Sequence, residues 1–309
     1  MTVWKSAALA AAAVAALLAP ANAQAPTRLV VGYTATVDTA PMFAGIEKGI
    51  FAKHGLEVVP QLVSVNSVLP AALIANNVQL GMATTTTFLQ AVDAGIDLVA
   101  VSGLNFTRKD EVNFGVIART GSGIAKPADF VGKKVGVPGL NAFLHVLFVD
   151  WLKKAGVDPR QVSIVETPFP QMNDILKSGS VAAVVGAEPF QSRIIKAGTG
   201  TMIAHFVQQE GLPIVVFAGA RAWVDGHAAA AKQFREAMAE AITFVMANQD
   251  AAREIAARNL KLPLDVVKTV QMPRFGVDVS ADSLRAWTGI MKSQNMLTRD
   301  VDVGKLVKS

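Results

Sequence analysis

The sequence predicts an α/β protein of two lobes, each with a mostly parallel sheet flanked by helices, and a ligand cleft between the lobes. The stretch from Lys126 to Phe190 alternates three short apolar runs with two helical patterns, each followed by glycine. Such a β-α-β-α-β unit requires parallel strands with right-handed crossovers. The residues on either side build a second unit, and the chain of 309 residues, 51% apolar, is long enough for two medium-sized cores.

The central unit forms most of the second lobe, which we expect to span residues 119–209. Its strands are Lys134–Val137, Val162–Val165, Val181–Val185 and Met202–Phe206. Its helices are Asn141–Lys154, Gln171–Lys177 and Pro189–Lys196. Ligands bind at the carboxyl ends of the strands in such sheets. Those ends are Pro138–Asn141, Thr167–Gln171 and Gly186–Phe190.

The first lobe is expected to be discontinuous, with residues 24–118 and 210–309. Its strands are Arg28–Tyr33, Leu56–Leu62, Val78–Ala83 and Asp97–Ser102, and its first helix runs from Met42 to about Lys53. Val112–Ala118 carries the chain out of this lobe and Leu212–Ala218 brings it back, so two crossings form a hinge. The helical patterns at 228–247, 250–259, 264–270 and 280–295 cover the first lobe.

The N-terminus has the proportions of a secretory signal peptide, residues 1–23. One basic residue precedes an Ala- and Leu-rich run, and Ala21-Asn22-Ala23 forms a cleavage site before Gln24. The alternative is a buried N-terminal helix. We expect cleavage after Ala23 and a periplasmic protein that is not embedded in the membrane. The chain has no cysteine, so it has no disulfide and no lipid-anchoring thiol.

Charge and motifs argue against nucleic-acid binding and against catalysis. The formal net charge is +5, and the basic residues are scattered rather than gathered in one stripe. The four histidines lie far apart in the sequence, and Gly132-Lys133-Lys134 lacks the other residues of a phosphate-binding loop. No nucleophile with an adjacent base is recognisable. We therefore expect a binding protein, with no catalytic residues, metal or cofactor.

Two corners at strand ends are candidate binding elements. Thr84, Thr85 and Thr86 follow the third strand and begin a helix, where hydroxyls and free backbone N–H groups suit an anion. The alternative is that they only cap the helix. In the facing lobe, Gly139 allows close approach of a ligand, and Asn141 can cap a helix or donate to the ligand.

Two acids have two interpretations each. Asp38 lies in the loop after the first strand, and Glu188 follows a strand of the second lobe. Each can accept bonds from a ligand or hold neighbouring backbone. If both face the cleft, the ligand carries a donor or a positive group. Further candidates lie at or near strand ends, with core packing as the alternative for some of them: Tyr33, Thr36, Met42, Asn105, His145 and Gln171.

Four segments between Leu29 and Phe190 resemble one protein family. They are LVVGYTATVDTAPMFAGIEKGIFAKHGLEV, KPADFVGKKVGVPG, WLKKAGVDPRQV and DILKSGSVAAVVGAEPF. These segments are similar to the periplasmic solute-binding proteins of ABC importers, in the subgroup for sulfonates, taurine, nitrate and thiamine precursors. The resemblance implies a type II periplasmic binding protein fold, a permease and its ATPase as partners, and action as a monomer.

The resemblance leaves the ligand open. Oxyanion-binding members often have Gly-Ser or Gly-Thr where this chain has Leu140, Asn141 and Ala142. We expect a small organic anion, a sulfonate or a carboxylate with an organic body. The alternatives are a thiamine-precursor pyrimidine, an amino-sulfonate, or a solute sensed for a membrane kinase. The same resemblance covers an enzyme that makes the thiamine pyrimidine, but that enzyme uses a cysteine-rich segment, which is missing here.

Overall fold

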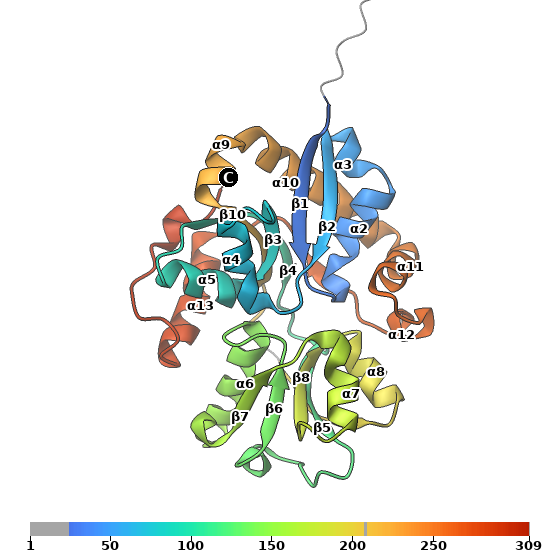
Figure 1. The fold of residues 1–309 in the computed structure, drawn as a ribbon, viewed down its shortest axis with the longest axis vertical. Coiled ribbons are helices and arrows are strands. Elements are labelled where there is room, and N and C mark those ends of the chain that lie inside the picture. The colour runs from blue at the N-terminus through green and yellow to red at the C-terminus, as the bar shows by residue number, and fades with distance from the viewer. Residues whose placement is uncertain (1–24, 207–208, 309) are drawn as a thin grey trace, which may run out of the picture.

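The computed structural model describes residues 25–206 and 209–308. The expected signal peptide and its cleavage site after Ala23 lie outside these residues. The described chain forms two lobes, one above the other in Figure 1, each built on its own sheet. Within the described residues, no helix is long and apolar enough to cross a membrane.

The first lobe contains a six-stranded sheet in the order β11-β4-β10-β3-β1-β2. The strands are β1 (Thr27–Tyr33), β2 (Leu56–Leu62), β3 (Leu80–Thr84), β4 (Leu98–Phe106), β10 (Pro213–Ala220) and β11 (Arg274–Phe275). Here β1 pairs in parallel with β2 and β3, whereas β10 lies antiparallel between β3 and β4. The strands β1 to β4 therefore all point toward the same edge of the sheet.

The second lobe repeats this arrangement in a five-stranded sheet, β7-β6-β8-β5-β9. The strands are β5 (Phe114–Arg119), β6 (Lys134–Val137), β7 (Ser163–Glu166), β8 (Ala183–Ala187) and β9 (Gly200–His205). The predicted parallel unit is present, because β6 pairs in parallel with β7 and β8. In the first lobe the strands β2, β1 and β3 are followed across the sheet by the antiparallel strand β10 and then by β4. In the second lobe β7, β6 and β8 are followed in the same way by the antiparallel strand β5 and then by β9.

Most strands of each sheet run in one direction, as predicted, but each sheet also contains antiparallel pairing. The strand β10 runs antiparallel to both of its neighbours, and so does β5 between β8 and β9. Both strands follow a crossing between the lobes, so each enters its sheet from the edge that faces the other lobe. As a result, the carboxyl ends of the other strands and the starting ends of β5 and β10 meet between the lobes.

The lobe boundary also differs from the expected one. We expected residues 112–118 to belong to the first lobe, but Phe114–Arg119 pairs with β8 and β9 in the second sheet. These partners lie about 70 to 90 residues further along the chain, so a local apolar pattern could not assign the strand to a sheet. The chain leaves the first lobe before Phe114 and returns between His205 and Pro213.

Helices cover both sheets. In the first lobe they are α2 (Ala40–Glu47), α3 (Ile50–Lys53), α4 (Leu69–Ile74), α5 (Thr85–Asp93), α9 (Arg221–Gly226), α10 (Ala228–Ala247), α11 (Gln249–Leu260), α12 (Leu264–Lys268) and α13 (Ala281–Ser293). In the second lobe they are α6 (Phe143–Lys154), α7 (Met172–Lys177) and α8 (Phe190–Lys196). The single helix expected over residues 42–53 is two helices, because Gly49 has a positive φ of 69° and interrupts it.

The C-terminal helices do more than cover the first lobe. Helix α10 packs on α2 and α3, as its apolar face predicts. Helix α13 instead reaches the second lobe: Trp287 lies edge-on to Phe143 of α6, with ring centroids 5.5 Å apart. Near its end, Gln294 Nε2 donates to the Val146 carbonyl at 3.3 Å. The two lobes are thus in direct contact in this conformation.

Candidate ligand-binding site between the lobes

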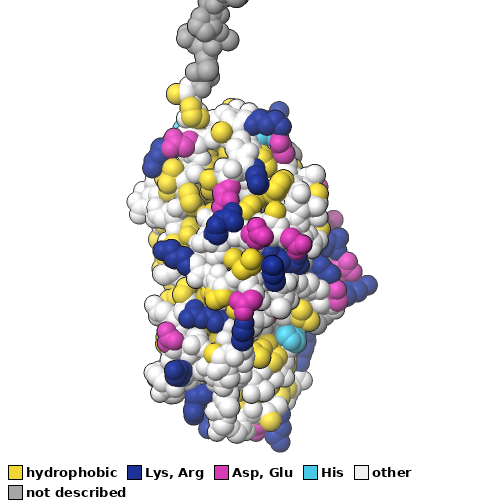
Figure 2. Space-filling model, turned by 90° about the vertical axis from the view of Figure 1, so that its right-hand side faces the viewer, with side chains coloured by type: hydrophobic (Ala, Val, Ile, Leu, Met, Phe, Trp, Pro, Cys, Tyr) yellow, Lys and Arg dark blue, Asp and Glu magenta, His cyan; other side chains and the backbone are white. Residues whose placement is uncertain are grey.

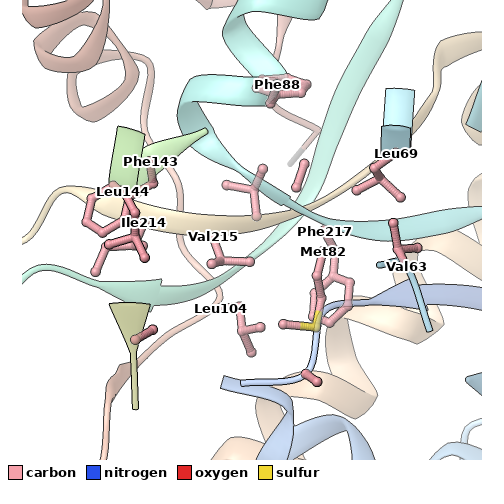
Figure 3. Close-up of a cluster of buried hydrophobic side chains, with 14 of the residues drawn as sticks. Val63, Leu69, Met82, Phe88, Leu104, Phe143, Leu144, Ile214, Val215 and Phe217 are labelled. Carbon is pink, nitrogen blue, oxygen red and sulfur yellow. The ribbon is translucent and has the colours of Figure 1, made fainter. Parts of the chain in front are cut away.

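A cavity of about 40 Å³ lies where the strand ends of the two lobes meet. Both lobes and both crossing strands contribute to its lining: Thr34, Thr36, Asp38, Asn66, Thr84, Phe114, Pro138, Ala142, Phe143, Leu144, Phe169, Ala187, Ile214 and Val215. None of these lining residues is lysine, arginine or histidine. Figure 3 shows part of the apolar wall, with Phe143 and Leu144 from α6 beside Ile214 of β10.

Thr84 lies where the N-termini of two helices meet. It is the N-cap of α5, and its Oγ1 accepts a hydrogen bond from the Thr87 N–H at 3.3 Å. The same oxygen accepts from the Phe143 N–H, at the start of α6 in the other lobe, at 3.3 Å. The positive ends of both helix dipoles are therefore directed at one hydroxyl in the cavity, an arrangement that favours an anion.

The other two threonines have different partners. Thr85 is fully buried, and its Oγ1 donates to the Pro213 carbonyl at 2.7 Å, which ties α5 to the returning strand β10. Thr86 is also fully buried, with its Oγ1 3.2 Å from that of Thr84. Only Thr84 of the three lines the cavity.

Asp38 places a carboxylate on the wall of the cavity. Its Oδ2 accepts from Thr36 Oγ1 at 3.0 Å, and its Oδ1 accepts from Asn105 Nδ2 at 2.7 Å. Burial removes water from the charged form and raises the pKa of Asp38 to about 6, against the lowering effect of the Thr36 bond. Asn105 lies within β4 rather than after it and is fully buried behind Asp38.

The facing corner brings backbone of both lobes together. A Cβ on Gly139 would lie 3.4 Å from the backbone nitrogens of Asn66 and Ser67 in the other lobe, and 3.2 Å from the Cβ of Ala142. Asn141 has a positive φ of 63°, and its N–H donates to His145 Nδ1 at 2.7 Å. Burial lowers the pKa of His145 to about 4. His145 thus holds the loop as a neutral acceptor, and neither it nor Asn141 lines the cavity.

Four other predicted residues lie away from the cavity. Met42 is fully buried in the core, and Tyr33 packs edge-on against Phe43 with centroids 5.1 Å apart. Gln171 lines a separate outer crevice between the lobes, together with Leu62. Glu188 accepts from Ser192 Oγ at 2.8 Å and from Ser192 N–H at 3.2 Å, so it holds the first turn of α8. Burial raises the pKa of Glu188.

Several lining residues were not predicted. Asn66 is the most informative, because its Nδ2 donates to the Met82 carbonyl and its Oδ1 accepts from the Thr84 N–H at 3.0 Å. It therefore positions Thr84 from the loop after β2. An Asn next to Ser67 at a predicted helix start is the signal that could have indicated it. Phe114 and Phe143, edge-on at 5.1 Å, form an aromatic wall from two elements that only the tertiary fold brings together.

Two curated relatives match parts of this chain. The nitrate import ATP-binding protein NrtC of Synechocystis is 26% identical in an alignment of 239 residues that covers 69% of this chain and 34% of NrtC. The nitrate/nitrite binding protein NrtA of Synechococcus elongatus is 24% identical in an alignment of 200 residues that covers 55% of this chain and 44% of NrtA. The chain thus spans less than half the length of each of these relatives.

Solved structures share the fold over nearly the whole chain. The alkanesulfonate-binding protein SsuA from Xanthomonas axonopodis pv. citri, bound to MOPS, superposes with a TM-score of 0.80 at 18% identity, covering 92% of this chain and 98% of SsuA. The periplasmic nitrate-binding protein NrtA from Synechocystis gives 0.76 at 18% identity, covering 92% and 86%. These matches establish a two-lobed periplasmic binding protein fold. The model of the NMT1-like family matches residues 22–260, so the chain belongs to the NMT1-like family.

Proposed function

We propose that this protein is the periplasmic substrate-binding component of an ABC importer, which captures a small organic anion between its lobes and delivers it to a permease. The observation that carries the proposal is the meeting of the N-termini of α5 and α6, one from each lobe, at the hydroxyl of Thr84 inside the cavity. An anionic group placed there accepts the Thr84 O–H and lies at the positive ends of both helices.

The matched proteins support the import role. NrtA and SsuA are named as binding proteins for nitrate or nitrite and for alkanesulfonates, and NrtC is named as an ATP-binding component of nitrate import. We therefore expect a membrane permease and a cytoplasmic ATPase as partners, and the protein to act in the periplasm as a monomer.

Closure follows from binding to both lobes. A ligand shifts the equilibrium between open and closed forms only by its difference in affinity for them. Because Thr36, Asp38 and Thr84 belong to the first lobe and Phe143 and Phe169 to the second, a solute in the cavity contacts all of them only when the lobes are closed. The closed form, recognised by the permease, is thereby stabilised.

The size of the cavity restricts the solute. A volume of about 40 Å³ corresponds to a few water molecules, since one water requires roughly 10–15 Å³ by this measure. A compact anion fits this conformation, and a larger one requires the lobes to lie further apart. The aromatic wall of Phe114, Phe143 and Phe169 provides an apolar surface for the organic part of the solute.

The direct test is thermal unfolding of the purified protein with acetate, propanoate, benzoate, methanesulfonate, nitrate and a methylammonium control. At about 100 times its dissociation constant a ligand adds about 2.7 kcal/mol, which raises Tm by several degrees. We expect a shift with small anions and none with methylammonium alone. The absence of a shift with every anion, in protein refolded after denaturation to remove retained solute, would contradict the proposal.

Replacing Thr84 with valine is expected to weaken binding of the best anion about tenfold or more. Valine keeps the shape of threonine but removes the hydroxyl to which both helix N-termini donate, and a hydrogen bond to a charged group contributes roughly 1.5–3 kcal/mol. Calorimetric titration measures the change. Thr84→Ser should retain most of the affinity, and Thr243→Val on the outer face of α10 should retain all of it. Equal affinity of Thr84→Val and wild type would remove this hydroxyl from the site.

Replacing Ser67 with alanine is expected to weaken binding about two- to fivefold. Ser67 Oγ of the first lobe donates to Glu166 Oε1 of the second at 2.6 Å, and this oxygen also accepts from the Leu140 N–H at 2.8 Å. The bond forms only on closure and is exposed, so its contribution is about 0.5–1 kcal/mol. The loss should appear in the dissociation constant. Ser180→Ala, which breaks an exposed hydroxyl contact within one lobe, serves as the control and should bind like wild type.

A further inference from the structure

We propose that Phe169 sets the length of the solute: its ring closes the cavity between the lobes against a larger crevice outside, so that a short anion fits and a longer one is excluded. This inference rests on the proposed function of solute binding and names a residue that determines its specificity. Phe169 lies just after β7 in the second lobe, at the start of a short 3-10 helix, Phe169–Gln171.

The outer crevice has a volume of about 140 Å³ and lies next to the cavity of about 40 Å³. Both lobes contribute to the lining of the crevice: Ala35, Leu62, Val63, Ser64, Pro168, Phe169, Pro170 and Gln171. Phe169 also lines the cavity. On the side of the first lobe, Ala35 lines the crevice, whereas its neighbours Thr34 and Thr36 line the cavity. The ring of Phe169 and the loop at residues 34–36 therefore separate the two spaces.

The ring of Phe169 is held in place from the second lobe. It is 7% exposed and stacks on Phe190, the first residue of α8, with centroids 5.7 Å apart and planes at 15°. Pro168 and Pro170 fix φ on either side of it, so the ring leaves its position mainly by rotation about its own side-chain bonds. That rotation breaks the aromatic stack. A longer solute must displace the ring or hold the lobes further apart, and either change lowers its affinity for the closed form.

The chemistry of the two spaces determines which part of the solute meets Phe169. None of the crevice residues is charged, and apart from Ser64 and Gln171 their side chains are apolar. The acid of the solute is therefore expected to stay in the cavity at Thr84, where the N-termini of α5 and α6 meet. The organic body is the part that extends toward the crevice. The position of the ring then decides how many carbon atoms can follow the acid.

The test is calorimetric titration of the protein with two series of anions of increasing length. The first series is methanesulfonate, ethanesulfonate, propanesulfonate and butanesulfonate, and the second is acetate, propanoate, butanoate and pentanoate. Within the series that binds, we expect the affinity of wild type to fall at least tenfold between its shortest and its longest member.

Replacing Phe169 with alanine joins the cavity and the crevice. The longest member should then bind at least tenfold more tightly than it does to wild type, because each methylene group removed from water contributes about fourfold in affinity. The shortest member should change much less, within about fivefold. Phe169→Leu keeps an apolar side chain in the core and is the variant to rely on if alanine does not fold. Leucine is smaller than the phenyl ring, so its effect should have the same direction and be smaller.

Phe148→Leu provides the matched control. Phe148 is a fully buried phenylalanine of the same lobe, packed against Phe130 and Trp151, and it lines neither the cavity nor the crevice. This variant loses a similar amount of core packing and should keep the length preference of wild type. Circular dichroism verifies that each variant is folded.

The outcomes separate the two proposals. If wild type binds the longest members as tightly as the shortest, or if both Phe169 variants keep the length preference of wild type, the role of Phe169 is overturned and solute binding stands. If no member of either series binds to any of these proteins, and the wider panel of anions is also inactive, the proposed function fails together with this inference.

Discussion

Replacing Trp287 with alanine is expected to lower the free energy of unfolding by about 3–5 kcal/mol. Trp287 is fully buried in α13, and its Nε1 donates to the Pro213 carbonyl at 2.8 Å. Its ring also lies edge-on to Phe143 of the other lobe. The substitution removes a large apolar side chain, leaves a cavity between α13 and β10, and deprives the Pro213 carbonyl of one of its two side-chain donors.

Urea unfolding followed by circular dichroism measures this change. Trp287→Phe should cost clearly less than alanine, because it keeps most of the apolar volume, although it loses the indole N–H and part of the bicyclic ring. Trp223→Ala is the comparison at a half-buried tryptophan, which lies in α9 and stacks on His227, and it should also cost less. If Trp287→Ala cost no more than Trp223→Ala, α13 would not be the anchor that the packing indicates.

The elements of the fold were largely predictable from the sequence because they depend on local patterns. The parallel β6-β7-β8 unit and the N-cap at Thr84 follow from apolar runs, glycines after helices and hydroxyls at a strand end. The insertion of β10 between β3 and β4 was not predictable in this way. Its partners are more than 100 residues away, and an apolar run specifies a strand without specifying its neighbours.

The site was predictable only in part, for a related reason. Thr36, Asp38 and Thr84 were predicted because strand ends in such sheets meet at one edge, and all three line the cavity. An acid or amide just after a strand can turn toward the cavity or toward its own helix, and the sequence does not distinguish these outcomes. Glu188 turns toward α8.

Charges on the surface gave little guidance to function. On the face shown in Figure 2, basic and acidic side chains alternate, without a large area of one sign. Many charged side chains of the described residues form ion pairs, as Arg258 does with Glu47 at 2.7 Å and Arg274 with Glu210 at 2.7 Å. The informative charge is the buried one at Asp38, which no surface property indicates.

Replacing Asp38 with asparagine is expected to stabilise the protein without solute by about 2–3 kcal/mol above pH 6. The pKa of Asp38 rises from 3.8 to about 6 on folding, chiefly through burial, and one pKa unit is about 1.4 kcal/mol. Asparagine can accept from Asn105 Nδ2 and donate to Thr36 Oγ1, so both bonds at this position are retained. Only the cost of burying the charge is removed.

The stabilising effect of Asp38→Asn should depend on pH, because the pKa of Asp38 differs between the folded and unfolded protein. Between pH 3.8 and about 6 the folded protein keeps the Asp38 proton that the unfolded chain has released, so the contribution of this group to stability falls as pH rises through that window. Glu111 acts in the same direction, because its negative charge raises the pKa of Asp38, whereas the bonds from Thr36 and Asn105 lower it. Urea titrations at pH 4 and pH 7.5 should show a difference between wild type and Asp38→Asn that is small at the first pH and full at the second.

Asp93 provides the opposite case, because its pKa is lowered in the folded protein whereas that of Asp38 is raised. Burial raises its pKa, but bonds from Thr298 and Arg299 outweigh burial and hold the pKa below its usual value. Asp93→Asn should therefore destabilise the protein at pH 7.5, where Asp38→Asn stabilises it. Asparagine at position 38 would satisfy the same neighbours without the cost of a buried charge. The carboxylate at the wall of the cavity therefore has a role other than stabilising the fold. Equal stability of wild type and Asp38→Asn at pH 7.5 would contradict the cost assigned to burial of the Asp38 charge.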